Sequence, residues 1–303
     1  MIVREATLDD VQDIVSVYLT NPDRPFDQPV KHLSIAERYS YGGPWMSVET
    51  CAIHLNNVLA WGHTPLVVEE GSRVVAETEF YIGRDVPPFG RTLDISVLYV
   101  HAEWQRRSAG SLLMEAMIDR ARRAGCDQVT VNTGPESQGF YRRFGFAHAL
   151  DLQVIRCDVA PMNSPSVCEL YVPRAFEAQP GGALWIGRFL SPAQKWREIV
   201  DAFERREAIL PQDAGRPAPV GISSTGKGFT GFLIPGWGNP ARARVHCWAE
   251  RPTREMVSSL LAEARRAGYS EAHLLCHPEV VEMVADVCGA QPAEAWPVWA
   301  RKV

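Results

Sequence analysis

A loop of small and basic residues near the middle of the chain has the composition of an anion-binding site. Backbone N–H groups at a helix start are free to bind an anion, and the helix dipole adds about half a positive charge there. Small residues let a phosphate approach closely, and neighbouring arginines add charge. The alternative is an ordinary strand-to-helix turn with solvated arginines. The loop residues are Gln105, Arg106, Arg107, Ser108, Ala109 and Gly110.

The elements around this loop follow from the spacing of apolar residues. The β-branched, apolar run 95–100 predicts a buried strand before the loop. After the loop, apolar residues at helical spacing predict a helix with one buried face, which ends at Gly125. A second strand ends at Asn132, and the segment GFYRRFGF then predicts a helix that carries Tyr141. The order is therefore strand, loop, helix, strand, helix.

This order and two of its motifs resemble the GCN5-related N-acetyltransferases, which bind acetyl-CoA. The loop is similar to that family's Q/R-x-x-G-x-G/A motif, and GFYRRFGF is similar to its F-Y-x-x-x-G-F signature. Asn132 and the segment 135–137 (Pro-Glu-Ser) also fit. Ser108 departs from the pattern, because the family has glycine there, and a Cβ at that point bears on cofactor affinity rather than on the fold. The resemblance covers about residues 1–150.

The resemblance implies an N-acyltransferase that uses acetyl-CoA as a co-substrate and moves an acetyl or other short acyl group to an amine by direct attack. The strand holding Leu98 and Val100 would diverge from the strand ending at Val131, and the pantetheine arm would pair with the exposed backbone between them. The loop 105–110 would hold the pyrophosphate, and Asn132 would hydrogen-bond the arm. Backbone N–H groups would stabilise the charge that develops on the thioester oxygen.

Three side chains are candidates for moving protons in such a reaction. Tyr141 is the candidate donor to the leaving thiolate, because a phenol of pKa about 10 suits a thiolate of pKa about 8.5. The amine is largely protonated at neutral pH and needs a base, for which Asp94 is the first candidate and Glu79 the second. The alternatives are a core aromatic residue for Tyr141 and solvent-facing strand carboxylates for the other two.

The rest of the first 160 residues supplies the elements that surround this site. Residues 26–62 are predicted to be mostly helical, with aromatic residues that either build an acceptor pocket or belong to the core. The other predicted elements are a strand at 2–4, a helix at 8–19 capped by Thr7, a hairpin of strands 64–69 and 73–82, and a last strand at 152–159.

The C-terminal part of the sequence is similar to a degenerate copy of the first part. The sequence ARRAG occurs at 121–125 and again at 264–268, and the order strand, helix, strand, helix, strand recurs over residues 243–301. The stretch 248–253 falls on the phosphate loop but has no glycine, and Glu250 would repel phosphate. The alternative is a chance similarity of alanine-rich helix ends.

The predicted fold class is therefore mixed α/β (α+β), with two tandem domains of this family, each a mostly antiparallel central sheet flanked by helices. We predict an acetyl-CoA-binding domain at residues 1–160, a connector at 161–183 that is rich in proline, serine and glycine, and a degenerate domain at 184–303.

Composition limits the possible partners of this 303-residue chain. The net charge of −5 argues against nucleic acid, and no apolar run approaches the ~20 residues of a membrane span. Seven scattered cysteines suggest reduced thiols, and no histidine or cysteine cluster predicts a metal site. We expect a cytoplasmic monomer or homodimer with a small-molecule or peptide amine as acceptor. A non-catalytic acyl-CoA sensor or assembly module is the alternative, favoured by Ser108 and opposed by Tyr141 and Asn132.

Overall fold

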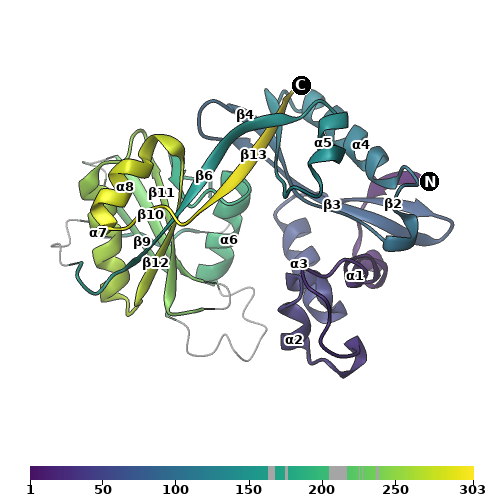
Figure 1. The fold of residues 1–303 in the computed structure, drawn as a ribbon, viewed down its shortest axis with the longest axis horizontal. Coiled ribbons are helices and arrows are strands. Elements are labelled where there is room, and N and C mark those ends of the chain that lie inside the picture. Colours follow the sequence, from purple (N-terminus) through teal and green to yellow (C-terminus); the bar gives the residue numbers. More distant parts are fainter. Residues whose placement is uncertain (163–167, 175–176, 205–216, 225, 227, 237–238) are drawn as a thin grey trace.

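Two lobes joined by two long strands make up the molecule (Figure 1). The computed structural model describes all residues except 163–167, 175–176, 205–216, 225, 227 and 237–238. The predicted connector at 161–183 therefore lies partly outside the described residues. No helix in the described part of the chain is long and apolar enough to cross a lipid bilayer.

The first lobe contains the elements that the sequence predicts, with small shifts at their ends. The predicted helix at 8–19 starts as a 3-10 turn, and the predicted strand at 152–159 begins earlier, at Ala147. The elements are β1 (Ile2–Glu5), η1 (Leu8–Asp10), α1 (Val11–Leu19), η2 (Val30–His32), α2 (Ile35–Tyr39), η3 (Gly43–Met46), α3 (Val48–Ala60), β2 (Leu66–Glu70), β3 (Arg73–Arg84), β4 (Arg91–Val100), η4 (Ala102–Trp104), α4 (Ala109–Arg123), β5 (Gln128–Asn132), α5 (Gln138–Arg143) and β6 (Ala147–Asp158).

The sheet of the first lobe has a helix layer on each face. On one face Leu113 and Met117 of α4 pack with Ile95 of β4 in one apolar cluster. On the other face Ile14 of α1 and Leu55 of α3 belong to a second cluster. Strands β1 to β4 are antiparallel neighbours, whereas β4 and β5 run parallel. Side chains that alternate along β3 and β4 therefore reach one helix layer or the other.

The five elements predicted for a copy of the first lobe are present as β11, α7, β12, η7 with α8, and β13, but β13 pairs with strands β5 and β6. Helix α6 is not among the predicted elements, although Trp196, Ile199, Val200 and Phe203 recur on it at helical spacing. The elements are β7 (Glu169–Leu170), β8 (Ala183–Ile186), α6 (Pro192–Glu204), β9 (Val220–Ser224), β10 (Phe229–Pro235), β11 (Arg242–Ala249), α7 (Arg254–Arg266), β12 (Glu271–Cys276), η7 (Pro278–Val280), α8 (Val281–Cys288) and β13 (Glu294–Lys302).

One sheet runs through both lobes. Within the described residues it has thirteen strands in the order β1-β2-β3-β4-β5-β13-β6-β12-β8-β11-β10-β9-β7. The C-terminal strand β13 returns to the first lobe and lies between β5 and β6, while β6 continues into the second lobe and pairs with β12. Each lobe thus shares a strand with the other, and the predicted domain boundaries at 160 and 183 stay predictions.

Candidate active site

The loop before α4 contains two residues with a left-handed backbone. Ser108 is the N-cap residue of α4 and has a left-handed backbone, with φ 71° and ψ −6°, and Arg106 also has a positive φ of 62°. A left-handed conformation costs a residue with a Cβ about 1–2 kcal/mol, whereas glycine adopts it freely. The serine therefore keeps the shape of the loop and stores strain in it. The side chains of Arg106 and Arg107 are exposed beside it.

Gln105 has a structural role in this loop. Its Nε2 donates to Oδ1 of Asn21 at 3.0 Å, and Asn21 Nδ2 in turn donates to the carbonyl of Val100 at 3.1 Å. Both contacts fix the loop to the end of α1 and to the end of β4. The sequence prediction placed Gln105 with the cofactor-binding residues, and the structure shows its amide engaged with the protein.

The strands β4 and β5 separate beside this loop. Their parallel pairing runs from Thr92 opposite Gln128 to Ile95 opposite Val131. At Ser96 the pairing of β4 with β3 shifts by one residue, which is a β-bulge. From Ser96 to Val100, which includes the predicted contact residue Leu98, no described strand pairs with the β5 side of β4. This part of β4 presents backbone groups without a strand partner to a ligand, apart from the carbonyl of Val100, which accepts from Asn21.

Asn132 lies at the end of β5, on the far side of this opening. It is opposite Val298 of β13, and its Nδ2 donates to the carbonyl of Pro297 at 3.2 Å. Its Oδ1 is 3.5 Å from Nη1 of Arg188. The second half of the chain thus holds both ends of this amide.

Tyr141 lies on α5 in the apolar layer that α4 also covers. Its ring packs against Phe140 and Phe146, with centroids 5.3 and 5.6 Å away. Burial raises the pKa of its phenol, and the nearby Tyr99 and Asp94 raise it further. The hydroxyl makes no hydrogen bond with any other described residue. Tyr141 is thus both a packed ring and an unused proton donor.

Asp94 is fully buried on β4, so it does not face solvent. Its Oδ2 accepts a hydrogen bond from Thr130 Oγ1 at 2.6 Å and lies 3.6 Å from Nη2 of Arg188. Burial raises the pKa of this carboxyl to about 6, and Asp85 adds to the rise, although Arg188 and Thr130 oppose it. Asp94 therefore changes charge just below neutral pH.

Glu79, the second candidate base, is also buried and has more partners. Its Oε1 accepts from Trp45 Nε1 at 2.9 Å and lies 2.8 Å from Nε2 of His54. Its Oε2 is 3.4 Å from the hydroxyl of Tyr81. Burial alone would raise the pKa of Glu79, but the nearby His54 and Arg197 outweigh it and lower that pKa.

A second carboxylate lies on the same face of β3. Glu77 accepts a hydrogen bond from the hydroxyl of Tyr18 at 2.7 Å, and Tyr18 stacks on Trp45 with ring centroids 5.1 Å apart. Burial and the charge of Glu79 raise the pKa of Glu77 well above its usual value. The aromatic residues of the helical segment 26–62 thus belong partly to this polar cluster, as Trp45 shows, and partly to the core, as Tyr41 shows.

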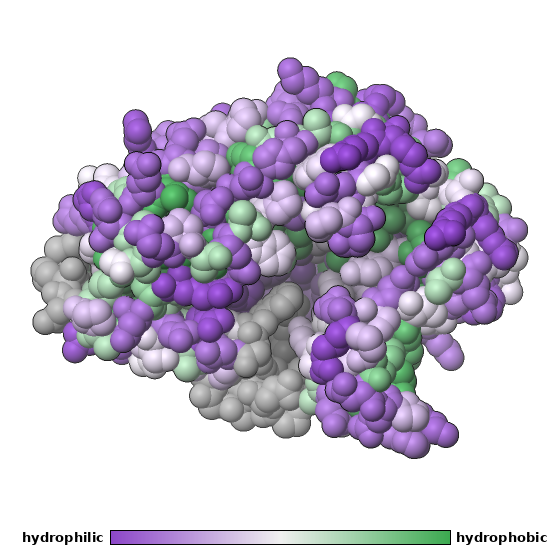
Figure 2. All heavy atoms as spheres, viewed as in Figure 1, coloured by the Kyte–Doolittle hydropathy of each residue, from purple (hydrophilic) through white to green (hydrophobic). Residues whose placement is uncertain are grey.

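The second lobe packs helix α6 against this face of the first lobe (Figure 1). Gln194 Nε2 donates to Ser96 Oγ at 2.8 Å, and Asp201 Oδ1 accepts from Trp61 Nε1 of the first lobe at 3.0 Å. A Cβ at Gly83 of β3 would lie 2.8 Å from that of Ala193. Figure 2 shows that the surface between the lobes is hollowed and largely hydrophilic.

Sequence reasoning missed the residues that the second lobe brings to the site. Arg188 follows β8 and donates from Nε to both oxygens of Asp85, at 2.8 and 3.0 Å, in a fully buried pair. Gln194 reaches the bulge of β4 from nearly one hundred positions further along the chain. No local pattern marks either residue, since their partners are distant in sequence.

The second lobe has its own pair of separating parallel strands. Strands β11 and β12 pair from Arg242 opposite Glu271 to Arg244 opposite His273. Beyond that point β8 lies between them, with Ile186 opposite both Cys247 and Cys276. The opening that stays free in the first lobe is therefore filled here by the chain itself.

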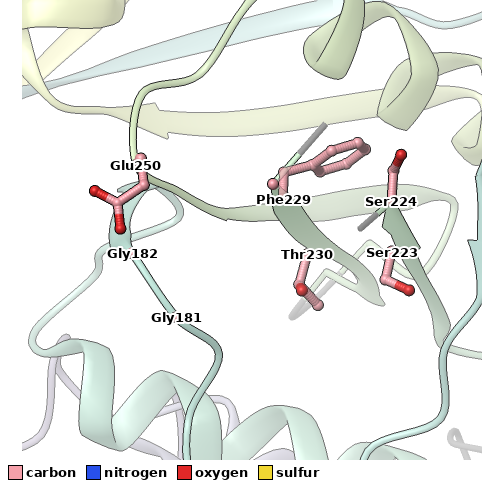
Figure 3. A pocket seen from close by; sticks show the side chains of 8 residues that line it. Gly181, Gly182, Ser223, Ser224, Phe229, Thr230 and Glu250 are labelled. Carbon is pink, nitrogen blue, oxygen red and sulfur yellow. The ribbon is translucent and has the colours of Figure 1, made fainter. Parts of the chain in front are cut away.

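A cavity of about 300 Å3 lies beside the stretch that was predicted to match the phosphate loop (Figure 3). Figure 3 shows Glu250 above Gly182 at one side of it and Phe229 and Ser224 at the other. Among the described residues that line it, the charged side chain is that of Glu250, which would repel a phosphate. Its lining is Gly181, Gly182, Ser223, Ser224, Gly228, Phe229, Thr230 and Glu250.

Comparisons with known proteins agree with this geometry. Residues 29–146 match the model of the acetyltransferase (GNAT) family, and no curated protein matches the chain. A GCN5-related N-acetyltransferase from Anabaena variabilis shares 11% identity over 99% of this chain and 72% of its own, with a TM-score of 0.62. One from Kribbella flavida shares 15% identity over 99% of this chain and 71% of its own, with a TM-score of 0.55.

At these identities the solved structures show a shared fold, and the match of residues 29–146 adds support for the GCN5-related N-acetyltransferase superfamily. The predicted fold class, a tandem of mostly antiparallel mixed α/β units, is confirmed.

Proposed function

We propose that the first lobe is an N-acyltransferase that moves an acetyl or other short acyl group from acyl-CoA to an amine by direct attack. The observation that carries the proposal is the free edge of β4 from Ser96 to Val100, which opens beside Tyr141 and Asp94. The family match of residues 29–146 supports the reaction class.

The residues at this opening fit acetyl-CoA as co-substrate. The backbone of β4 around Leu98 and Val100 would pair with the pantetheine arm as an added strand. Backbone N–H groups from Arg106 to Gly110 would hold the pyrophosphate at the start of α4, where the helix dipole favours an anion. Asn132 would border the arm at its far end. When bound, acetyl-CoA supplies the activated acyl carbon and a thiolate as leaving group.

Asp94 suits the role of general base better than Glu79. Both oxygens of Glu79 contact protein groups, whereas Oδ1 of Asp94 has no hydrogen-bond partner among the described residues. A pKa of about 6 leaves Asp94 mostly ionised at neutral pH and able to take a proton from an ammonium group.

The proton balance of the reaction then follows. Asp94 takes one proton from the ammonium, and the freed nitrogen attacks the acyl carbon while N–H groups of β4 stabilise the oxyanion. Tyr141 gives its proton to the sulfur as the C–S bond breaks. The proton that the nitrogen loses on amide formation returns to the Tyr141 oxygen through water, and Asp94 releases its proton to solvent. Amine and thioester become amide and thiol.

We infer further that the second lobe is a degenerate copy that binds no acyl-CoA. Strand β8 lies where the pantetheine arm would pair, with Ile186 between Cys247 and Cys276. Glu250 stands in the matching loop and lines a cavity beside it, where its charge would repel phosphate. Both the pantetheine arm and the phosphates of acyl-CoA would therefore lack a binding site in the second lobe.

Release of the CoA thiol from acetyl-CoA in the presence of a panel of primary amines tests the enzyme proposal. Turnover with any amine that is lost in Tyr141→Phe supports it. The strained Ser108 favours the second candidate, a non-catalytic acyl-CoA sensor or assembly module. A chain that is stabilised against melting by acetyl-CoA but acylates none of the amines would be that module.

A further inference from the structure

Two buried side-chain oxygens near the β4 bulge have no hydrogen-bond partner in the described part of the chain. They are Oδ1 of Asp94 and Oε1 of Gln194. The side chains are 0% and 5% exposed, so bulk solvent does not satisfy them. Buried polar atoms in native proteins nearly always have a partner, and an unpaired one requires an explanation.

The two side chains approach the same short stretch of β4. Gln194 uses its other amide atom, Nε2, to donate to Ser96 Oγ at 2.8 Å. Ser96 is the bulge residue and follows Asp94 by two positions, and each side chain meets a residue of the second lobe, Gln194 and Arg188 respectively. The neighbour of Gln194 on α6, Lys195, is close enough to influence the charge of Asp94.

The groups that contact the Asp94 carboxylate lie at Oδ2, and Oδ1 is left able to accept a hydrogen bond from a ligand. Thr130 and Arg188 both approach Oδ2, at 2.6 and 3.6 Å. Arg188 makes its shortest contacts with Asp85, and Lys195 is paired with Glu198 at 2.7 Å. A ligand that reaches Oδ1 therefore does not have to displace an existing hydrogen bond.

We propose that Asp94 Oδ1 and Gln194 Oε1 form the seat of the acceptor's amino group. Both atoms only accept hydrogen bonds from a ligand, since the amide nitrogen of Gln194 is engaged with Ser96. A primary ammonium group has three N–H donors and no acceptor, which matches two unpaired oxygens. A carboxylate or phosphate would meet two acceptor atoms and be repelled.

The inference rests on the proposed function and extends it in two ways. It identifies the acceptor class as a primary amine that binds as its ammonium ion. It also gives the second lobe a part in the first lobe's reaction, because Gln194 belongs to α6. The degenerate half would then supply an acceptor-binding residue in place of a cofactor site.

Equilibrium binding to the full chain tests the seat without turnover. With CoA bound, n-butylammonium and n-butanol are titrated separately, and their affinities are measured by calorimetry or ligand-detected NMR. We expect the wild type to prefer n-butylammonium. Gln194→Met keeps the length of the side chain but removes the acceptor, and we expect it to weaken n-butylammonium binding about tenfold or more, the scale of a hydrogen bond to a charged group.

Two further variants separate the seat from general packing. Gln194→Glu keeps an acceptor oxygen, so n-butylammonium affinity should be retained or increased. Gln179→Met removes another buried, unpaired glutamine oxygen, in the connector before β8, and should leave n-butylammonium affinity unchanged. Melting temperature and CoA affinity are measured for each variant, and both should match the wild type.

Equal affinity for n-butylammonium in the wild type and in Gln194→Met overturns the seat, as does equal binding of n-butanol and n-butylammonium by the wild type. In either case a buried water satisfies the two oxygens. Failure of the proposed function looks different, because a wild-type chain that binds no CoA, or that acylates none of the amines, fails before this comparison begins.

Discussion

Arg188 Nη2 lies 3.6 Å from Asp94 Oδ2, although the two residues come from different lobes. Arg188 follows β8, and Asp94 is on β4. The same guanidinium is held by Asp85, so its position is fixed whether or not Asp94 is charged. Burial raises the pKa of the proposed base, and Arg188 from the second half of the chain partly opposes that rise.

The rate should rise with pH through the pKa of Asp94. Burial raises that pKa to about 6, above the ordinary aspartate value, so the carboxyl is protonated below about pH 6 and ionised above it. Because only the ionised form accepts a proton, kcat/KM should increase tenfold per pH unit on the acid side and level off above about pH 7. Steady-state rates from pH 4.5 to 8.5 measure this limb.

Asp94→Asn is the matched variant for the pH profile. It should remove the limb near pH 6 and lower the plateau, while CoA affinity stays unchanged. If the limb persists in Asp94→Asn, another group with a similar pKa acts as the base.

Tyr141→Phe removes the proposed proton donor and keeps the buried ring. General acids contribute typically ~10²–10⁴-fold to rate, so kcat should fall at least about tenfold even if water partly substitutes. The affinity for acetyl-CoA should change little, since the loop before α4 is untouched. On one preparation, steady-state kinetics measure kcat and a melting curve measures the stability of the fold. Normal turnover would leave Tyr141 as a packing residue.

Ser108→Gly should relax the strained loop. The left-handed φ of 71° at Ser108 is one that glycine adopts without penalty. We expect tighter binding of acetyl-CoA, by up to about fivefold if ~1 kcal/mol of strain is relieved on binding. Calorimetric titration measures it, and weaker binding in the glycine variant would mean that the serine hydroxyl itself holds the phosphate.

Gly110→Val is the opposite test of the same loop. A Cβ at Gly110 would already lie 3.4 Å from Val100 Cγ2 and 3.6 Å from the ring of Phe140, so the two further methyl groups collide with β4 or α5. Acetyl-CoA affinity should fall strongly, and an unchanged affinity would remove this loop from the cofactor site. The melting temperature shows whether the fold survives.

One acetyl-CoA should bind per chain. The first lobe leaves β4 and β5 separated, whereas β8 fills the matching space in the second lobe. Calorimetry of the full chain should therefore give a stoichiometry of about one. Two equal sites per chain would contradict the inference that the second lobe is degenerate.

The sequence was most informative where local patterns decide the structure. The helix that starts at Ala109, the strand before it and the helix with Tyr141 follow from apolar spacing and turn residues, and they were predicted with small errors. The loop motif also marked Ser108 as unusual, and its left-handed backbone gives the physical reason. These features depend on residues close together in the chain.

The parts that the sequence did not reveal depend on distant contacts. Apolar spacing is enough to predict helix α6, but the burial of its charged residues Lys195, Arg197 and Asp201 depends on ion pairs that no periodicity shows. Arg188 and Gln194 reach the site only because two lobes pack together. The pairing of β13 with strands of the first lobe could not be predicted either, since the sequence pattern of one strand does not identify the strand that it pairs with.

The position of β13 also has a consequence for the order in which the protein forms. During synthesis β5 and β6 are made well before β13, the strand that lies between them in the folded protein. Until then two strand edges are open to pairing with other chains. The nascent first lobe is thus exposed to aggregation, and Asn132 gains its partner Pro297 only after β13 has been made.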